Sequence, residues 1–201
     1  MISKGCYVNE VDNMEKTPLY VACFYGNFSV CELLIKNKSD VNQHDCKGMT
    51  PLMVACYNGY VKIAEILIQS DALVDMTDKN GETAILQVMS SWKKEVVELL
   101  IKKNCDLNKP NKRGWTPLMA ACSKGCKTIV ENLLSHKADT KTTDQRGETW
   151  LHRACASGDL QLVELVVHKS SNNVIDIDTR NSLPNGSLQK WPSFYLQVSN
   201  R

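Results

Sequence analysis

Apolar residues recur along the chain at helical intervals, in segments that polar stretches separate. Residues 27–38 (NFSVCELLIKNK) are typical, because Val30, Leu33, Leu34 and Asn37 fall at helical spacing. A shorter helical segment precedes each longer one, and a tight turn joins the two. One such pair of helices cannot bury its own apolar stripe, so the pattern predicts helix pairs that stack against their neighbours.

A threonine marks the start of each copy of a 33-residue repeat, at Thr17, Thr50, Thr83, Thr116 and Thr149. Proline follows three of these threonines, and leucine or isoleucine stands one residue further on in every copy. Alanine and glycine then recur at fixed places, the glycines at Gly26, Gly59, Gly125 and Gly158. Self-similarity at a fixed period of this length predicts a solenoid.

Each repeated residue type has a local structural role. The threonine can cap the exposed amides of the first helix, and proline suits the first helical position. Glycine ends that helix where a left-handed backbone conformation is needed. Polar turns such as DCKG (45–48) and DQRG (144–147) precede the threonine, and their Asp and Gly suit a turn that projects from the stack.

These residues together resemble the ankyrin-repeat family, from residue 1 to roughly residue 181. The resemblance implies an all-α repeat solenoid, in which antiparallel helix pairs stack and β-hairpin or turn fingers project at right angles. We expect a repeat domain over residues 1–182, with a partial repeat at 1–16, and a non-repeat tail at 183–201.

The chain departs from the family pattern in several copies. The signature histidine remains only as His152, for which the resemblance implies a structural hydrogen bond. The third repeat has Ala84 in place of proline, Trp92 in place of glycine and Lys94 at a usually apolar position. We therefore expect the third repeat to be the softest internal segment, or to be bent locally.

Both ends of the sequence are irregular. Residues 1–9 align with residues 34–42, so we expect an array that is truncated or spliced from a longer one. The tail at 183–201 contains Trp191, Phe194 and Tyr195 and no recognisable repeat. It is either an improvised cap or loose terminus, or a docking motif.

Charge, apolar content and cysteine content indicate in which cellular compartment the protein is expected. The first 100 residues contain nine Lys/Arg against 13 Asp/Glu, whereas residues 101–201 contain 15 against nine. No secretory segment and no apolar run of about 18 residues is present, so we expect neither secretion nor membrane insertion. Nine cysteines in such a chain predict reduced thiols and a location in the cytoplasm or nucleus.

Catalytic and metal-binding motifs are missing from the sequence. Cys23, Cys56, Cys122 and Cys155 repeat one core position, where cysteine acts as a small apolar residue. No Cys-x-x-Cys pair, phosphate loop or nucleophile elbow occurs. The sequence therefore predicts a protein that is not an enzyme and that holds no cofactor or metal.

The resemblance implies that partners bind the finger tips and the exposed face of each first helix, on the concave side of the stack. Aromatic and Met residues occupy these positions near the N-terminus, and basic residues surround a tryptophan in repeats 4 and 5. The candidate contact residues are Phe24, Tyr25, Met49, Tyr57, Lys112, Arg113, Trp115, Lys124, Arg146 and Arg153. Alternatively, the aromatic residues cover a repeat edge and the cations are merely solvated.

The favoured function is a monomeric scaffold that binds another protein, with an acidic or phosphorylated segment facing repeats 3–5. The alternative is a fragment of a larger multidomain protein, such as a ubiquitin-ligase adaptor, a channel or a membrane–cytoskeleton linker. Nucleic-acid binding is disfavoured, because Asp139, Asp144 and Glu148 interrupt the basic half.

Overall fold

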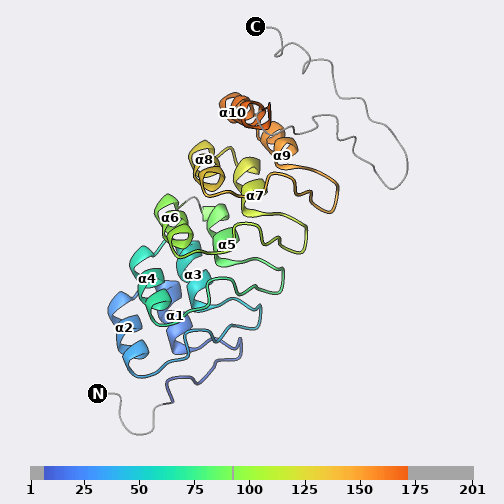
Figure 1. Ribbon diagram of the computed structural model, residues 1–201. Coiled ribbons are helices and arrows are strands. Elements are labelled where there is room, and N and C mark those ends of the chain that lie inside the picture. The colour runs from blue at the N-terminus through green and yellow to red at the C-terminus, as the bar shows by residue number, and fades with distance from the viewer. Residues whose placement is uncertain (1–6, 92, 172–201) are drawn as a thin grey trace.

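The computed structural model describes residues 7–91 and 93–171, which form a stack of five helix pairs with turns projecting along one side (Figure 1). The shorter first helices lie next to the projecting turns, and the second helices lie on the far side of them (Figure 1). The pairs are α1 (Pro18–Tyr25) with α2 (Phe28–Lys36), α3 (Pro51–Asn58) with α4 (Val61–Gln69), α5 (Ala84–Ser91) with α6 (Lys94–Lys102), α7 (Pro117–Ser123) with α8 (Lys127–Ser135), and α9 (Trp150–Ser157) with α10 (Leu160–Ser171).

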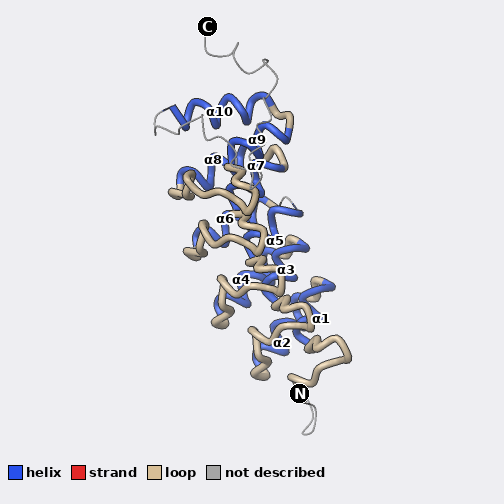
Figure 2. The backbone as a smooth tube through the Cα atoms, turned by 90° about the vertical axis from the view of Figure 1, so that its right-hand side faces the viewer, coloured by secondary structure: helices blue, strands red, loops and turns tan. Residues whose placement is uncertain are grey.

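The projecting fingers are turns. Between residues 7 and 171, leaving residue 92 aside, no residue lies in a β-strand (Figure 2). The expected stack of helix pairs is therefore confirmed, and its fingers take the turn form rather than the strand-paired form.

Capping residues define the first helices as predicted. The hydroxyls of Thr17, Thr50 and Thr116 accept the backbone N–H three residues later, at 3.1, 3.2 and 3.4 Å. The proline after each of these threonines is the first helical residue. His152 makes the expected structural contact, because its Nδ1 lies 2.8 Å from the Thr149 hydroxyl and accepts the Thr149 N–H at 3.2 Å.

A continuous apolar core runs through all five helix pairs. One of its columns contains Leu19, Leu52, Ile85 and Leu118, all essentially inaccessible to solvent. Three of the repeated cysteines, Cys23, Cys56 and Cys122, are equally buried. Burial raises the pKa of the Cys122 thiol to about 12, so this cysteine is neutral at physiological pH and packs as an apolar residue.

Each finger is organised by one acceptor side chain. Asp45 Oδ1 accepts the backbone N–H groups of Lys47 and Met49, both at 2.9 Å. The equivalent residues Asp12, Asp78, Asn111 and Asp144 repeat this arrangement. Successive fingers are then joined by one backbone hydrogen bond each, such as that from Lys79 N to the Lys47 carbonyl at 2.9 Å.

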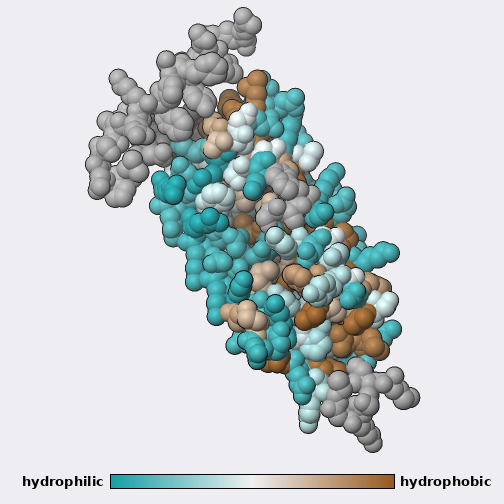
Figure 3. All heavy atoms as spheres, turned by 180° about the vertical axis from the view of Figure 1, so that it is seen from behind, coloured by the Kyte–Doolittle hydropathy of each residue, from teal (hydrophilic) through white to brown (hydrophobic). Residues whose placement is uncertain are grey.

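Two residues of the apolar stripe predicted in segment 27–38 are not buried. Leu34 lies in the core, but Val30 and Leu33 are 46% and 48% exposed. The equivalent of Val30 in the second repeat, Ile63 of α4, is only 2% exposed, and α4 packs against α2 of the first repeat. Apolar side chains consequently gather on the surface near the N-terminal end of the stack, where no described repeat precedes them (Figure 3).

The third repeat is complete in its two helices, α5 and α6. Lys94 points to solvent at the start of α6 and forms an ion pair with Glu98 at 3.5 Å. Trp92 and the tail residues Trp191, Phe194 and Tyr195 lie outside the described residues. The predicted softness of this repeat and the role of the tail therefore remain predictions.

Candidate functional site

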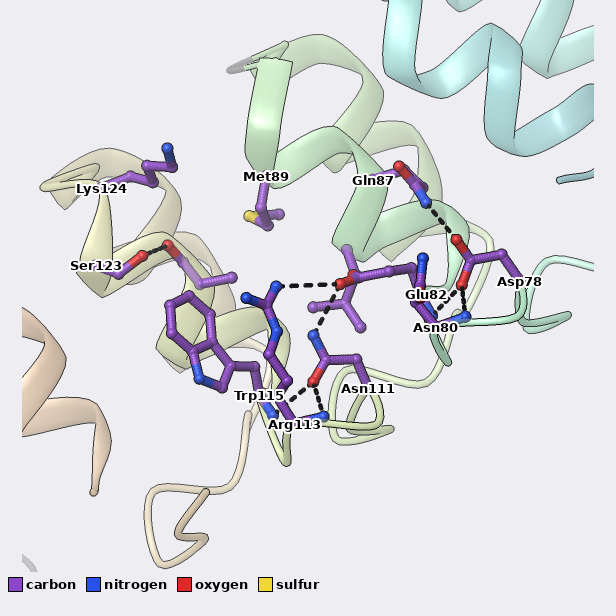
Figure 4. A pocket seen from close by; sticks show the side chains of 12 residues that line it. Asp78, Asn80, Glu82, Gln87, Met89, Asn111, Arg113, Trp115, Ser123 and Lys124 are labelled. Carbon is purple, nitrogen blue, oxygen red and sulfur yellow. Dashed lines mark hydrogen bonds and ion pairs between the residues drawn. The ribbon is translucent and has the colours of Figure 1, made fainter. Parts of the chain in front are cut away.

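A cavity of about 590 Å³ opens on the concave side of the stack, between the third and fourth repeats (Figure 4). Turn residues 78–82 and 111–115 form one side of it, and the first helices α5 and α7 form the other. Trp115 supplies most of the apolar surface, next to the buried side chains of Leu86 and Met89. Asp78, Glu82, Arg113 and Lys124 supply charge. The cavity can therefore accept a side chain that has both an apolar and a charged part.

Arg113 lies against the face of Trp115, with its guanidinium carbon 5.0 Å from the ring centroid (Figure 4). A second guanidinium, that of Arg153, lies 4.3 Å from the same ring. Cation–π contacts of this kind restrict the motion of an arginine while leaving its N–H groups available as donors. Because its side chain is 69% exposed, Arg113 can present those donors to a ligand.

Glu82 is the carboxylate of the cavity nearest Arg113, and it already has partners within the protein. Its Oε1 accepts a hydrogen bond from Asn111 Nδ2 at 2.8 Å and lies 3.8 Å from Arg113 Nη2. Burial raises the pKa of Glu82, and the neighbouring Asp78 adds to this effect, while Asn111 and Arg113 oppose it. The Glu82 carboxylate thus neutralises part of the Arg113 charge.

Arg153 was a candidate contact residue on the exposed face of a first helix, but its side chain is turned toward the protein. Its side chain is only 14% exposed and forms ion pairs with both Asp144 and Glu148. The hydrogen bonds of Asp144 to the backbone of its own turn fix that carboxylate directly beside the guanidinium. Arg153 therefore stabilises the last finger and supports Trp115 from behind.

The remaining basic residues project from the same surface. Lys112, Lys124 and Arg146 are exposed, and within the described ranges none of them forms an ion pair. The nearby acids are engaged internally instead, because Asp78 and Asp144 bind turn amides and Glu148 pairs with Arg153. Asp78 and Asp144 are buried whereas these three cations and Arg113 are exposed, so the charge that this surface presents to solvent is mainly positive.

The expected aromatic residues lie near the N-terminal end of the concave side. Phe24 and Tyr25 are exposed and contact each other edge to face, with ring centroids 5.2 Å apart. Tyr57 is exposed at the equivalent place in the second repeat. Met49 differs from them, because it is half-buried against the core and its Sδ accepts a hydrogen bond from Gln87 at 3.4 Å.

Three residues of the cavity, Leu86, Met89 and Asn111, were not among the predicted site residues. Leu86 and Met89 are only 4% and 3% exposed, so they border the cavity as members of the core, where the repeat period places them. Asn111 could have been noticed in the sequence, because it is an Asn at a repeat position that is Asp in the other four copies. The amide lets this residue donate to Glu82 while it still accepts from its own turn.

Metal ligands do not gather at this site: within 7–91 and 93–171, no group of three or more His, Cys, Asp or Glu residues is placed to hold an ion. The described helices also include none that is long and apolar enough to cross a membrane. The charged and aromatic groups that do converge are those with which proteins bind other proteins.

The sequence was compared with models of known protein families. The family model described as "Ankyrin repeats (3 copies)" matches residues 1–80, 70–144 and 86–181. No curated protein matches the chain. The matched ranges cover most of the sequence, and the chain therefore belongs to the ankyrin-repeat family, whose repeats are generally protein–protein interaction modules.

Proposed function

We propose that this protein is a non-enzymatic scaffold whose concave surface binds an acidic or phosphorylated segment of a partner protein at repeats 3–5. One observation carries the proposal: the acids around the cavity are engaged within the protein, while Lys112, Arg113, Lys124 and Arg146 project into solvent. The nine cysteines in a sequence without a recognisable secretory segment support a location in the reducing cytoplasm or nucleus.

Arg113 is the central recognition residue. A guanidinium binds a carboxylate or phosphate through two parallel hydrogen bonds, and such charge-assisted pairs are the strongest hydrogen bonds at protein surfaces. The contact with Trp115 already restricts this side chain, so binding costs less conformational entropy than for a free arginine. An incoming anion would compete with Glu82, whose Oε1 lies 3.8 Å from Arg113 Nη2.

The apolar surface of the cavity adds selectivity. Trp115 is half-buried and lies beside Arg113, so a ligand with an aliphatic or aromatic side chain next to its acidic group gains contacts with both. A purely polyacidic chain gains only the electrostatic part, which falls steeply with salt. The best ligand is therefore a mixed acidic and apolar segment.

The aromatic residues Phe24, Tyr25 and Tyr57 extend this surface toward the N-terminus. Packed helices lie about 8–10 Å apart, so the two repeat steps from Tyr57 to Lys124 span about 16–20 Å, or about five to six residues of extended chain. A linear segment of that length could contact the aromatic residues and the cavity at the same time.

The test is a selection of random displayed peptides on the purified full chain, followed by affinity measurements on the enriched sequences. We expect enrichment of peptides that combine Asp or Glu with an apolar residue. The variant Arg113→Glu/Lys124→Glu should bind them at least about tenfold more weakly.

The matched control is Lys62→Glu/Lys102→Glu, which makes the same charge change at exposed positions on the outer helices α4 and α6. This control variant should retain most of the wild-type affinity for the enriched peptides. Phosphorylated versions of the peptides should bind the wild-type protein at least as tightly as the unphosphorylated ones. Enrichment of basic peptides, or an equal loss in both double variants, would reject the proposal.

A further inference from the structure

The exposed apolar residues of the first repeat belong to the surface with which repeats stack. Val21 and Val30 are 38% and 46% exposed, whereas their second-repeat equivalents, Val54 and Ile63, are 3% and 2% exposed. The same column is fully buried at Leu162 in the fifth repeat. These positions therefore face the preceding repeat, and in the first repeat no described helix pair covers them.

The other end of the stack shows the opposite pattern. Leu151 and Val163 in the fifth repeat are half-buried, whereas their fourth-repeat equivalents, Leu118 and Val130, are fully buried. These positions face the following repeat. The two ends of the described stack thus carry the two complementary halves of one repeat junction.

The surface at the first repeat is also hollowed. A groove of about 510 Å³ is lined by the apolar residues Val11, Pro18, Val21 and Val30, with Glu10, Asp12 and Lys16 on its rim. Side chains of both charge signs thus border an apolar centre, which is the usual arrangement of a protein–protein interface.

The fingers have complementary ends as well. In each internal junction the second residue of a finger donates its N–H to a carbonyl of the preceding finger, as Cys46 N does to the Met14 carbonyl at 2.9 Å. Among the described residues, the N–H of Asn13 and the carbonyl of Arg146 are the two members of this series without such a bond. One finger can therefore be added at each end with the same bond.

From these three observations we propose that two copies of the chain stack head to tail, with α9 and α10 of one copy covering Val21, Val30 and Leu33 of the next. The contact continues the geometry of the internal junctions, and one chain supplies both of its halves. It differs from the monomer expected from the sequence, and it is separate from the concave binding surface. A heterologous contact of this kind does not close, so assembly grows with concentration.

The experiment is sedimentation velocity on the full chain from about 1 μM to about 1 mM, a range that covers weak self-association. The wild-type protein should show a weight-average mass that rises with concentration. Val30→Asp/Leu33→Asp should raise the dissociation constant at least about tenfold, and these exposed substitutions should leave the circular dichroism spectrum unchanged. Leu73→Asp, also at an exposed leucine, is the matched control and should behave as wild type.

A mixing experiment identifies which surfaces meet. Val163→Glu blocks the other end, and its fold is checked by circular dichroism before use. Each variant alone should stay monomeric, while the mixture of Val30→Asp/Leu33→Asp with Val163→Glu should form a one-to-one dimer through the two intact ends. If Val163→Glu does not fold, the comparison between Val30→Asp/Leu33→Asp and Leu73→Asp still decides the proposal. A monomeric wild type over the whole range, unchanged assembly of Val30→Asp/Leu33→Asp, or a mixture that stays monomeric would overturn it.

Discussion

Repeats 1 and 2 have similar sequences and the same backbone arrangement, but they differ in what covers them. Val21 and Val54 are the same residue at the same repeat position, and only Val54 is buried. The helix pair of the first repeat lies over Val54, whereas no described repeat lies over Val21. An amphipathic pattern therefore identifies which residues can pack, while the neighbouring repeat determines whether they do.

The finger of the fifth repeat also differs from the internal fingers in its contacts. Internal fingers are linked to the next finger by a backbone hydrogen bond, as in the bond from Gln145 N to the Arg113 carbonyl at 3.1 Å. The last described finger, at 144–148, keeps this bond to the preceding finger and is also held by Arg153, which pairs with Asp144 and Glu148. In the third repeat Gln87 occupies the position of Arg153 and donates to Asp78 at 3.2 Å, so a neutral hydrogen bond there becomes an ion pair in the last finger.

The largest predicted effect is a difference in stability between substitutions at a buried and at an exposed valine. Val54→Ala should lower the free energy of unfolding by about 2–3 kcal/mol, because it removes buried methyl groups and leaves a cavity. Val21→Ala should lower it by less than about 1 kcal/mol, since this side chain is partly solvated. Urea denaturation at low protein concentration measures both values, and equal losses would show that a further contact covers Val21.

The second prediction concerns the last finger. Burial raises the pKa of Asp144, but hydrogen bonds from Arg153 and from the N–H groups of Glu148 and Arg146 outweigh it, so the pKa lies below its ordinary value of 3.8. A carboxylate with a lowered pKa in the folded state adds stability above its unfolded pKa, and this contribution is lost as the pH falls through the folded value.

Asp144→Asn should therefore lower the free energy of unfolding at pH 7 by about 1.5 kcal/mol, the low end for a charged hydrogen bond, because Glu148 still pairs with Arg153. Asn111 shows that an amide supports the same turn. Unfolding measured from pH 7 downward should show the two proteins converging as Asp144 becomes protonated. A difference that persists at acid pH would mean that the amide disturbs the turn itself.

The smallest predicted effect is a difference in stability between substitutions at two threonines, each of which precedes a first helix. Thr50 caps α3 by accepting the Met53 N–H, whereas the Thr83 hydroxyl is buried and has no hydrogen-bond partner in the structure. Thr50→Val should cost about 1 kcal/mol, and Thr83→Val should change stability by less than about 0.5 kcal/mol. Thermal melting of both variants measures the contrast. A substantial loss in Thr83→Val would reveal a partner such as bound water.

The sequence was sufficient to predict the repeat phase and the residues that bound the first helices. The 33-residue spacing places Thr17, Thr50 and Thr116 one residue before a helix, and Gly26 and Gly59 just after one. Both residue types have backbone or hydrogen-bonding preferences that act locally, so their roles follow without knowledge of distant contacts. The exposed positions of Lys112, Arg113, Lys124 and Arg146 followed from the same register.

Side-chain partners could not be predicted in this way. Its position in the repeat placed Arg153 on the concave side of the stack. Its side chain turns inward because it pairs with the Asp144 carboxylate. The left-handed backbone after α2 and α8 was also unforeseen, because Lys38 and Lys137 occupy it at φ values of 64° and 63° where glycine is the usual residue. At these two positions the conformation depends on the surrounding stack and has no signature in the residue type.

The hydrogen bonds that join successive fingers also have a mechanical consequence. Each repeat contacts mainly the repeats before and after it, and each finger is tied to the next by one backbone bond, as Lys112 N is to the Asn80 carbonyl. The junctions are therefore arranged in series. A force pulling on the two ends is carried in full by every junction, so the weakest opens first and releases one repeat. The 33-residue period thus also sets the step by which the stack lengthens under load.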